Sequence, residues 1–183
     1  KGKSLIRYIT FAEVFGSDPA LAEIRMSGAL RVCEEMRLRG LQAQVTPHSL
    51  YSVSAALSAL IRQHIPASAV ISLHFLESDD ERRMAQDHAD SALDLSRLVT
   101  SLLLVHNTVI TREEAARVAS AGNTWFCLCP SSNMHISGKM PPAAMLREVT
   151  DRIVTGTDSL ASADRLSMIT ELQLLQEAVP EIA

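Results

Sequence analysis

The stretch LQAQVTPH, residues 41–48, alternates strictly between apolar and polar side chains. This period of two is typical of a β-strand with one apolar and one polar face. A strand between two helix layers should be apolar on both faces, whereas a barrel strand can turn polar side chains toward the mouth of its lumen. The stretch therefore favours a barrel over an open, doubly wound sheet. The apolar positions are Leu41, Ala43, Val45 and Pro47, and the polar ones are Gln42, Gln44, Thr46 and His48.

Strand-like and helix-like segments alternate along the whole chain, and no linker divides them. This order predicts a parallel sheet. A complete (β/α)8 barrel needs about 250 residues, and only six units are predicted in these 183. We therefore expect an α/β fold in which residues 1–183 form a single domain, an incomplete TIM-type barrel. The expected strands are residues 5–15, 41–47, 68–76, 101–106, 123–129 and 152–157.

Helix signals fall between the expected strands. The caps are Ser17 or Asp18 before Pro19, Ser52 or Ser54, and Thr111 with Glu114 as a capping box; Gly40 and Gly122 would end two helices. Residues 141–148 and 163–177 would supply the last two helices. The connection from Glu81 to Ser101 has a helix-like part, DDERRMAQ, but no clear turn signal, so a mobile lid segment could be missing there.

Composition argues against several classes of protein. The chain is 47% apolar and has a formal net charge of −4 without a basic cluster, which argues against nucleic-acid binding. Its longest apolar runs, such as residues 102–105, are far shorter than the roughly 20 residues of a membrane span. There is no secretory signal peptide, so we expect a cytoplasmic protein. Its three cysteines do not indicate a disulfide framework.

Polar side chains recur where the expected strands end. His48, His74 with Glu77, His106 and Asp158 each stand at or just after such an end. In a parallel barrel the carboxyl ends of the strands open on one face, so residues far apart in sequence meet around one pocket. Imidazole and carboxylate groups suit zinc and similar divalent ions. The pattern predicts a catalytic metal site, although any one of these histidines alone could be a hydrogen-bonded structural residue.

Five segments together carry a family resemblance. In this order at strand ends, they resemble the amidohydrolase superfamily, in its branch of cytosine deaminases, guanine deaminases and chlorohydrolase-like enzymes. The resemblance covers about residues 6–182. The segments are HSLYSVS (48–54), LHFLESDDE (73–81), LLLVHNT (102–108), CPSSNMHISG (129–138) and GTDSLAS (156–162).

The resemblance implies a role for each strand-end residue. His74 would ligate the metal, and Asp158 would be a second ligand that also takes a proton from the metal-bound water. Glu77 would shuttle protons. His106 would lie beside the metal and contact the substrate or the developing oxyanion, and His48 would contact the substrate near the pocket mouth.

The resemblance also implies supporting groups and a cofactor. The PSSN segment would be a loop that shapes the pocket, with Asn133 as a substrate contact, and Ser159 and Ser162 would support Asp158. The cofactor would be one divalent metal, zinc or alternatively iron, because LQAQVTPH lacks the lysine that bridges two metals in binuclear members. The partner would be a small-molecule substrate. The oligomeric state is left open, although members of the branch are often dimeric or larger.

One motif of the family is absent. The family takes two further metal ligands from an HxH motif on its first barrel strand, and no HxH occurs in this chain. The first strand-like stretch, RYITFAEVFG (7–16), resembles the family's third strand. We therefore expect a longer protein with earlier strands upstream, and we expect residues 1–183 by themselves to bind metal weakly and to be inactive.

The expected activity is metal-dependent hydrolysis, in which a metal-bound hydroxide deaminates an aminated purine, pyrimidine or triazine-like ring. A chlorohydrolase or a cyclic-amide hydrolase would use the same groups on another leaving group. In a different class, a decayed barrel without metal would act as a binding or scaffold protein.

Several further residues are expected to be structural. Cys127 and Cys129 would be buried in a strand, His64 and His88 would lie on the surface, and His135 would face solvent from a loop. Glu171 would form a salt bridge within the barrel, and Gly156 would allow close packing rather than bind phosphate.

Overall fold

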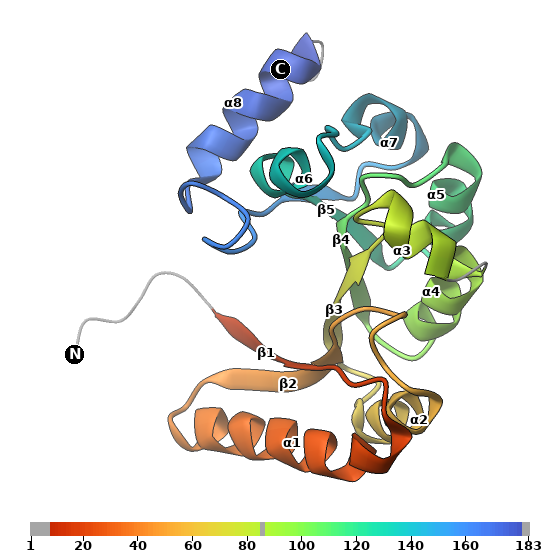
Figure 1. Ribbon diagram of the computed structural model, residues 1–183, viewed down its shortest axis with the longest axis vertical. Helices are drawn as coiled ribbons and strands as arrows, with labels where there is room; N and C mark the ends of the chain where they lie inside the picture. The colour runs from red at the N-terminus through yellow and green to blue at the C-terminus, as the bar shows by residue number, and fades with distance from the viewer. Residues whose placement is uncertain (1–7, 85–86, 181–183) are drawn as a thin grey trace.

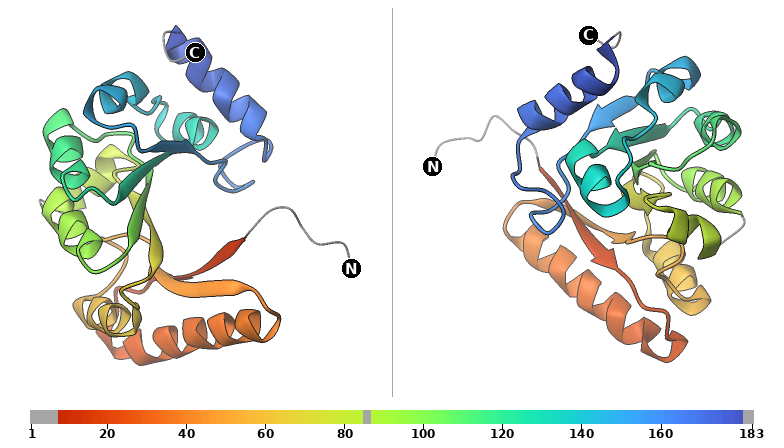
Figure 2. Two further views of the ribbon diagram at one scale, coloured as in Figure 1. Left: turned by 180° about the vertical axis from the view of Figure 1, so that it is seen from behind. Right: turned by 45° about the horizontal axis from the view of Figure 1, so that its top comes forward.

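The computed structural model describes residues 8–84 and 87–180. In this part of the chain, six parallel strands form a curved wall with helices along its outer side (Figures 1 and 2). The predicted partial barrel of six βα units is thereby confirmed. Residues 5–7 of the first expected strand and residues 85–86 of the helix-like DDERRMAQ lie outside the described residues.

The strands run in chain order around the wall. β1 pairs with β2, and β3, β4, β5 and β6 form a second sheet in that order. In the register of this sheet Phe75 lies opposite His106, so the carboxyl ends of β3 and β4 are level. We call the edge formed by the carboxyl ends of all strands the carboxyl rim. The strands are β1 (Ile9–Val14), β2 (Gln42–Pro47), β3 (Val70–Phe75), β4 (Ser101–His106), β5 (Thr124–Leu128) and β6 (Ile153–Thr155).

Side chains close much of the seam between β2 and β3. The Gln44 amide and the Thr46 hydroxyl each donate a hydrogen bond to a carbonyl oxygen of β3. At the rim, the backbone N–H of His74 donates to the carbonyl of His48 at 2.9 Å. The other face of β2 buries Val45 in an apolar cluster with α1 and α2. The polar face of residues 41–48 therefore joins the two sheets.

Polar caps begin most of the predicted helices. Asp18 accepts a hydrogen bond from Ala20, Ser54 caps α2, and Thr111 with Glu114 forms a full capping box. The helices are η1 (Pro19–Leu21), α1 (Ala22–Leu38), α2 (Ala55–His64), α3 (Asp79–Met84), α4 (His88–Ser96), α5 (Arg112–Ala119), α6 (Pro130–Ser137), α7 (Ala143–Val149) and α8 (Met168–Ala178).

Three expectations about connections need correction. The PSSN segment and His135 belong to helix α6 and not to a loop. The last helix begins at Met168 rather than at residue 163, because Ser167 supplies its cap. The connection between Glu81 and Ser101, where a missing lid segment was considered, contains helix α4. This helix packs in the apolar cluster against β3 and β4.

The apolar faces of the strands point outward to the helices. Ile71, Leu73 and Phe75 of β3 are fully buried there, as the alternation of that strand predicts. One cluster joins β1 and β2 to α1 and α2, and a second joins β3, β4 and β5 to α4, α5, α7 and α8. The inward face carries polar side chains on β3, Ser72 and His74, and apolar ones opposite them on β4, Leu103 and Val105.

Several buried residues confirm or correct the sequence analysis. Cys127 and Cys129 are buried, and a Cβ on Gly156 would lie 2.9 Å from the Cys127 sulfur, so Gly156 serves close packing. His88 is not a surface residue: it is 3% exposed and meets the Phe75 ring edge-on. Glu171 is fully buried and accepts the Ser131 N–H at 2.9 Å, and among the described residues it forms no salt bridge.

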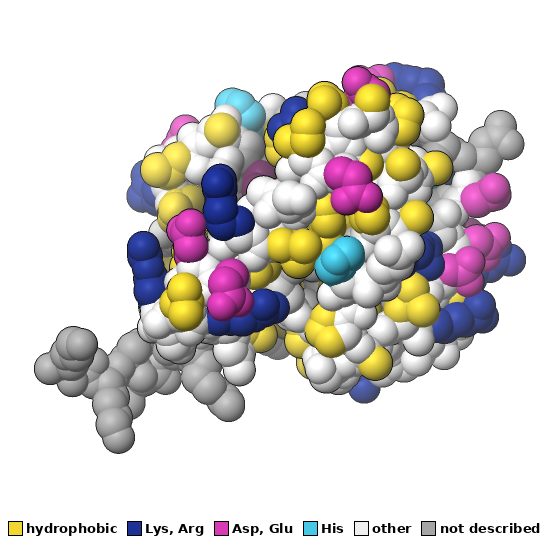
Figure 3. All heavy atoms as spheres, turned by 90° about the horizontal axis from the view of Figure 1, so that it is seen from below, with side chains coloured by type: hydrophobic (Ala, Val, Ile, Leu, Met, Phe, Trp, Pro, Cys, Tyr) yellow, Lys and Arg dark blue, Asp and Glu magenta, His cyan; other side chains and the backbone are white. Residues whose placement is uncertain are grey.

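The exposed surface mixes side chains of different kinds. Acidic, basic and apolar groups are interspersed on the face shown in Figure 3. Over residues 8–84 and 87–180, no helix combines the length and the apolar character that crossing a membrane requires. The cytoplasmic location stays a prediction.

A partly buried ion pair ties α3 to α5 and gives a first testable prediction. Arg82 donates to both Glu114 oxygens, at 3.0 and 2.8 Å, and this pairing lowers the pKa of Glu114 against the opposing effect of burial. Glu114→Gln keeps the cap but removes the charge, so we expect the free energy of unfolding at pH 7 to fall by about 0.5–1 kcal/mol. Urea denaturation of the full-length protein measures this change in the free energy of unfolding.

The expected effect depends on pH in one direction. Since the folded-state pKa of Glu114 is lowered, its stabilisation is present above the unfolded pKa of about 4.3 and is lost as the pH falls through the folded value. The difference between wild type and Glu114→Gln should therefore shrink in acid. Glu148→Gln, which removes a pair between exposed side chains, is the matched control. An equal loss for Glu114→Gln at neutral and acidic pH would contradict the ion-pair explanation.

Candidate active site

Strained backbone marks the carboxyl rim. Among the described residues, the non-glycine residues with positive φ are Leu76 (50°), His106 (80°), Asn107 (57°) and Asp158 (58°). All of them stand at or just after the ends of β3, β4 and β6. Left-handed backbone costs such residues roughly 1–3 kcal/mol each, and it gathers where a site must hold side chains in place. The strain therefore points to the same rim as the strand-end pattern of the sequence.

Three imidazole rings lie in a row at this rim. The His74 ring stacks between those of His48 and His106, with ring centroids 4.5 and 4.9 Å away. His74 Nδ1 lies 2.8 Å from His106 Nε2, and its Nε2 lies 3.2 Å from a carboxylate oxygen of Glu13. The structure thus brings together histidines that are 26 and 32 residues apart in sequence.

The outer partners of His74 and His106 determine where their protons lie. Glu13 accepts the His74 Nε2–H, and the Asn133 carbonyl oxygen accepts the His106 Nδ1–H at 2.9 Å. In neutral rings, the two nitrogens that face each other would then both carry lone pairs. Only a shared proton or a cation can hold such a pair together. The arrangement therefore fits a cation between the rings.

A carboxylate completes this donor set. The Glu77 carboxylate lies 3.3 Å from His106 Nε2, and His74, Glu77 and His106 each direct one ligand atom into a space where these atoms are within 4.8 Å of one another. A second such set is Glu13, His48 and His74. Nitrogen and oxygen donors of this kind suit zinc and related divalent ions. His74 belongs to both sets, whereas Asp158 belongs to neither.

Asp158 follows β6 and is held by two hydroxyl groups. Ser132 Oγ donates to its Oδ2 at 2.6 Å, and Ser162 Oγ donates to the same oxygen. These hydrogen bonds outweigh the effect of burial and lower the pKa of Asp158. Ser159 instead accepts the N–H of Ala161, so of the two serines expected to support Asp158 only Ser162 contacts it. Asp158 is thus kept ionised.

The other groups at the rim differ in how readily they hold a proton. Burial raises the pKa of Glu77 and lowers that of His106. Burial also opposes charge on His74, but the hydrogen bond to Glu13 outweighs it and raises the pKa of His74. Two carboxyl groups with opposite shifts, Glu77 and Asp158, therefore stand at one rim, as a proton donor and a proton acceptor would.

The three expected substrate contacts differ in accessibility. His48 is partly exposed, whereas His106 and Asn133 are fully buried. The Asn133 amide is engaged with His106 on both sides, since its nitrogen also donates to the His106 carbonyl at 3.3 Å. Asn133 therefore orients the His106 ring, and its role as a substrate contact stays a prediction.

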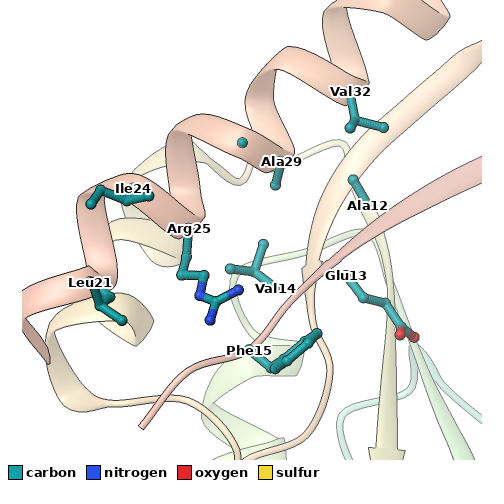
Figure 4. Close-up of a pocket in the computed structure, with 10 residues that line it drawn as sticks. Ala12, Glu13, Val14, Phe15, Leu21, Ile24, Arg25, Ala29 and Val32 are labelled. Carbon is teal, nitrogen blue, oxygen red and sulfur yellow. The ribbon is translucent and has the colours of Figure 1, made fainter. Parts of the chain in front are cut away.

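Sequence reasoning missed Glu13. Its neighbours Ala12 and Val14 are buried toward α1, and Figure 4 shows the Glu13 carboxylate pointing away from that helix. A groove of about 660 Å³ lies between β1 and α1, and its lining includes Ala12, Glu13, Val14 and Phe15 of the strand and its end. The signal was present in RYITFAEVFG, because a lone acid between two apolar residues of a strand faces the opposite side from them.

The fold and the rim together define a class: a parallel (β/α) barrel protein with imidazole and carboxylate groups at the carboxyl ends of its strands. The chain belongs to the amidohydrolase family, whose model matches residues 13–179. The family resemblance noted in the sequence is thereby confirmed.

Relatives of known name match most of this chain. A putative aminohydrolase of Methanothermobacter thermautotrophicus is 29% identical over 150 residues, which are 80% of this chain and 37% of the relative. An adenosine deaminase of Helicobacter pylori is 24% identical over 93% of this chain and 48% of its own length. A 5-methylthioadenosine/S-adenosylhomocysteine deaminase of Halobacterium salinarum is 27% identical over 86% and 38%. The chain thus spans less than half the length of these relatives.

Solved structures show the same fold. Helicobacter pylori aminofutalosine deaminase in complex with methylthio-coformycin has a TM-score of 0.76 at 24% identity, over 93% of this chain and 48% of that one. Atrazine chlorohydrolase TrzN from Arthrobacter aurescens, complexed with zinc, has a TM-score of 0.72 at 15% identity, over 96% and 44%.

Proposed function

We propose that the protein of which this chain is part is a metal-dependent hydrolase that deaminates an aminated heterocycle. The observation that carries the proposal is the meeting of His74, Glu77 and His106 at one rim, with an ionised Asp158 at the same rim. Family membership supports hydrolytic chemistry. The strained backbone at the same strand ends supports a functional role for the rim.

A divalent cation, zinc in the first place and iron as the alternative, is part of the proposal. His74 and Asp158 would hold it, with Glu77 and His106 beside it. The lone pairs that face each other between the His74 and His106 rings support a cation next to His74, whereas Asp158 comes into the assignment from its motif, since it lies outside both donor sets. When bound, such an ion supplies a Lewis acid and brings the pKa of a coordinated water from about 15.7 to near 7.

The two carboxyl groups divide the proton transfers between them. Asp158, whose pKa is lowered, is ionised at neutral pH and accepts the proton of the attacking water. Glu77, whose pKa is raised by burial, holds a proton more readily and delivers it to the ring nitrogen next to the carbon under attack. Glu77 then takes the proton of the newly added hydroxyl group and passes it to the amino group, which leaves as ammonia while the carbonyl forms. A proton transfer from Asp158 to Glu77 restores both carboxyl groups to their starting state.

The histidines would contact the substrate and stabilise the charge that develops on it, and Asn133 orients one of these histidines. His106 lies 3.3 Å from the Glu77 carboxylate, and with the shared proton on its Nε2 it would stabilise negative charge that develops on the substrate. Asn133 holds the His106 ring through its Nδ1–H and so fixes which nitrogen faces the site. His48, the most accessible of the three stacked histidines, would contact the substrate at the mouth.

An adenine nucleoside is the first substrate class to test. Several relatives are named as deaminases of adenosine, 5-methylthioadenosine or S-adenosylhomocysteine. Hydrolytic deamination of an adenine ring needs an acid at a ring nitrogen and a base for water, the two roles proposed for Glu77 and Asp158. Pyrimidine and triazine substrates remain the alternatives within the same chemistry.

The experiment is a substrate panel on the full-length protein with measured metal content. Adenine nucleosides, cytosine and an aminotriazine are scored for ammonia, a chlorotriazine is scored for chloride, and a cyclic amide is scored for ring opening. Ammonia release that is lost on chelation and restored by zinc supports the proposal. Chloride release or ring opening without ammonia would show another hydrolase of the family. A protein without bound metal, and without any rate gain from added zinc or iron, would be a scaffold.

A further inference from the structure

Behind Glu77 lies a second carboxylate that the proposed reaction does not use. Glu81 is only 3% exposed, and its Oε2 accepts the backbone N–H of Glu77 at 2.8 Å. Its other oxygen has no hydrogen-bond partner among the described residues. A buried carboxylate is costly to keep in a protein interior. Its position directly behind a proposed proton shuttle therefore calls for a specific role.

The local geometry shows what Glu81 holds. The backbone N–H of Glu81 donates to Ser78 Oγ at 3.3 Å, as in a capping box. The carboxylate, however, reaches past Ser78 to the N–H of Glu77. This contact spans the turn that follows Leu76, whose φ of 50° is strained. Glu81 thus locks the backbone at the point where Glu77 leaves β3.

Glu81 and a histidine are both buried near the end of β3. Burial raises the pKa of Glu81 against the opposing effect of the backbone hydrogen bond from Glu77, and His88, at the start of α4, is equally buried. The His88 ring packs edge-on against Phe75, next to His74 in the chain. Two buried ionisable side chains therefore hold the end of β3 and the turn after it: Glu81 bonds to the Glu77 N–H, and His88 packs against Phe75.

We propose that Glu81 is a positioning residue for Glu77: it fixes the backbone of Glu77 so that the Glu77 carboxylate faces His106. The inference rests on the proposed function of Glu77. Because Glu81 acts on a backbone N–H, what it needs is an oxygen acceptor at the right reach rather than a particular charge. This requirement distinguishes it from a group that transfers protons.

Three substitutions in the full-length protein test the requirement. Glu81→Leu removes the acceptor at similar volume, and we expect kcat to fall about 10- to 100-fold with KM within about 3-fold, because a small misplacement of a catalytic group costs this much. Glu81→Gln keeps an oxygen at the same reach and should retain kcat within about 3-fold. Glu81→Asp withdraws the acceptor by one methylene and should lose activity. The control is Glu148→Leu, which removes an exposed carboxylate of α7 and should leave kcat and KM unchanged.

Hydrogen exchange at the Glu77 amide gives a readout independent of activity. It should accelerate in Glu81→Leu and Glu81→Asp and stay slow in Glu81→Gln. Unchanged kcat and exchange in Glu81→Asp would overturn the inference, and so would equal losses in Glu81→Gln and Glu81→Leu. If Glu81→Leu fails to fold, the other two variants still decide. If the wild-type protein releases no ammonia, the proposed function fails, whereas the exchange data still show whether Glu81 holds Glu77.

Discussion

Glu77→Gln in the full-length protein is expected to lower kcat for ammonia release about 10²- to 10⁴-fold, the range that a well-placed acid or base contributes. The amide keeps the size of the side chain and can still hydrogen-bond to His106, but it cannot carry a proton to the ring nitrogen. KM should change little, because binding of the substrate does not depend on the transfer. Steady-state assays of ammonia, with KM measured alongside, test this expectation.

The control for this prediction is an acid far from the rim. Glu34→Gln alters an exposed residue of α1 whose ion pair with Arg37 is loose, at 3.7 Å, and it should leave kcat unchanged. Ammonia release at the wild-type rate in Glu77→Gln would remove the shuttle role from this residue. Membership of the family would stand, since it does not depend on Glu77.

His74→Ala should also lower activity strongly, but through the affinity for the metal rather than through proton transfer. His74 is common to both donor sets at the rim, so its loss removes a ligand from either. We expect metal affinity to fall by at least the roughly 10- to 100-fold that loss of a supporting contact costs, and activity to fall with it. Metal content after dialysis and the zinc concentration needed for half-maximal activity are the measurements.

An exposed histidine provides the comparison for His74. His64→Ala removes a ring on α2 that bonds only to the Leu60 carbonyl, and it should change neither metal content nor rate. Thermal unfolding of both variants separates loss of metal from loss of fold. His74→Ala with a full complement of metal would contradict the proposed site, whatever its activity.

The course of the chain could be predicted because each unit carries its own signals. The alternation over residues 41–48 predicted the barrel wall, and Val45 is buried on the expected side. The capping box at Thr111 placed the start of α5 without any tertiary information. The strand ends indicated His74 and His106 because parallel strands must open on one edge, and the two rings do meet.

What could not be predicted depends on contacts between units distant in sequence. His88 was expected at the surface because it stands in helix-like or turn sequence, yet its ring packs edge-on against Phe75. The buried carboxylate of Glu171 accepts the backbone N–H of Ser131 in α6. This partner is 40 residues away, so no local sequence pattern could predict it. The motif suggested a substrate contact for Asn133, which stays a prediction, whereas its two hydrogen bonds to His106 are visible only in the fold.

The left-handed residues at the carboxyl rim have a consequence for selection experiments on this protein. Leu76 is fully buried in the apolar cluster beside β3 and β4, and the Asn107 amide donates to the Leu104 carbonyl at 2.7 Å. Glycine at either position would therefore lose more in packing or hydrogen bonding than the roughly 1–2 kcal/mol of steric cost that it relieves. A library screened for heat resistance and one screened for turnover should therefore both keep the native residues at these two sites.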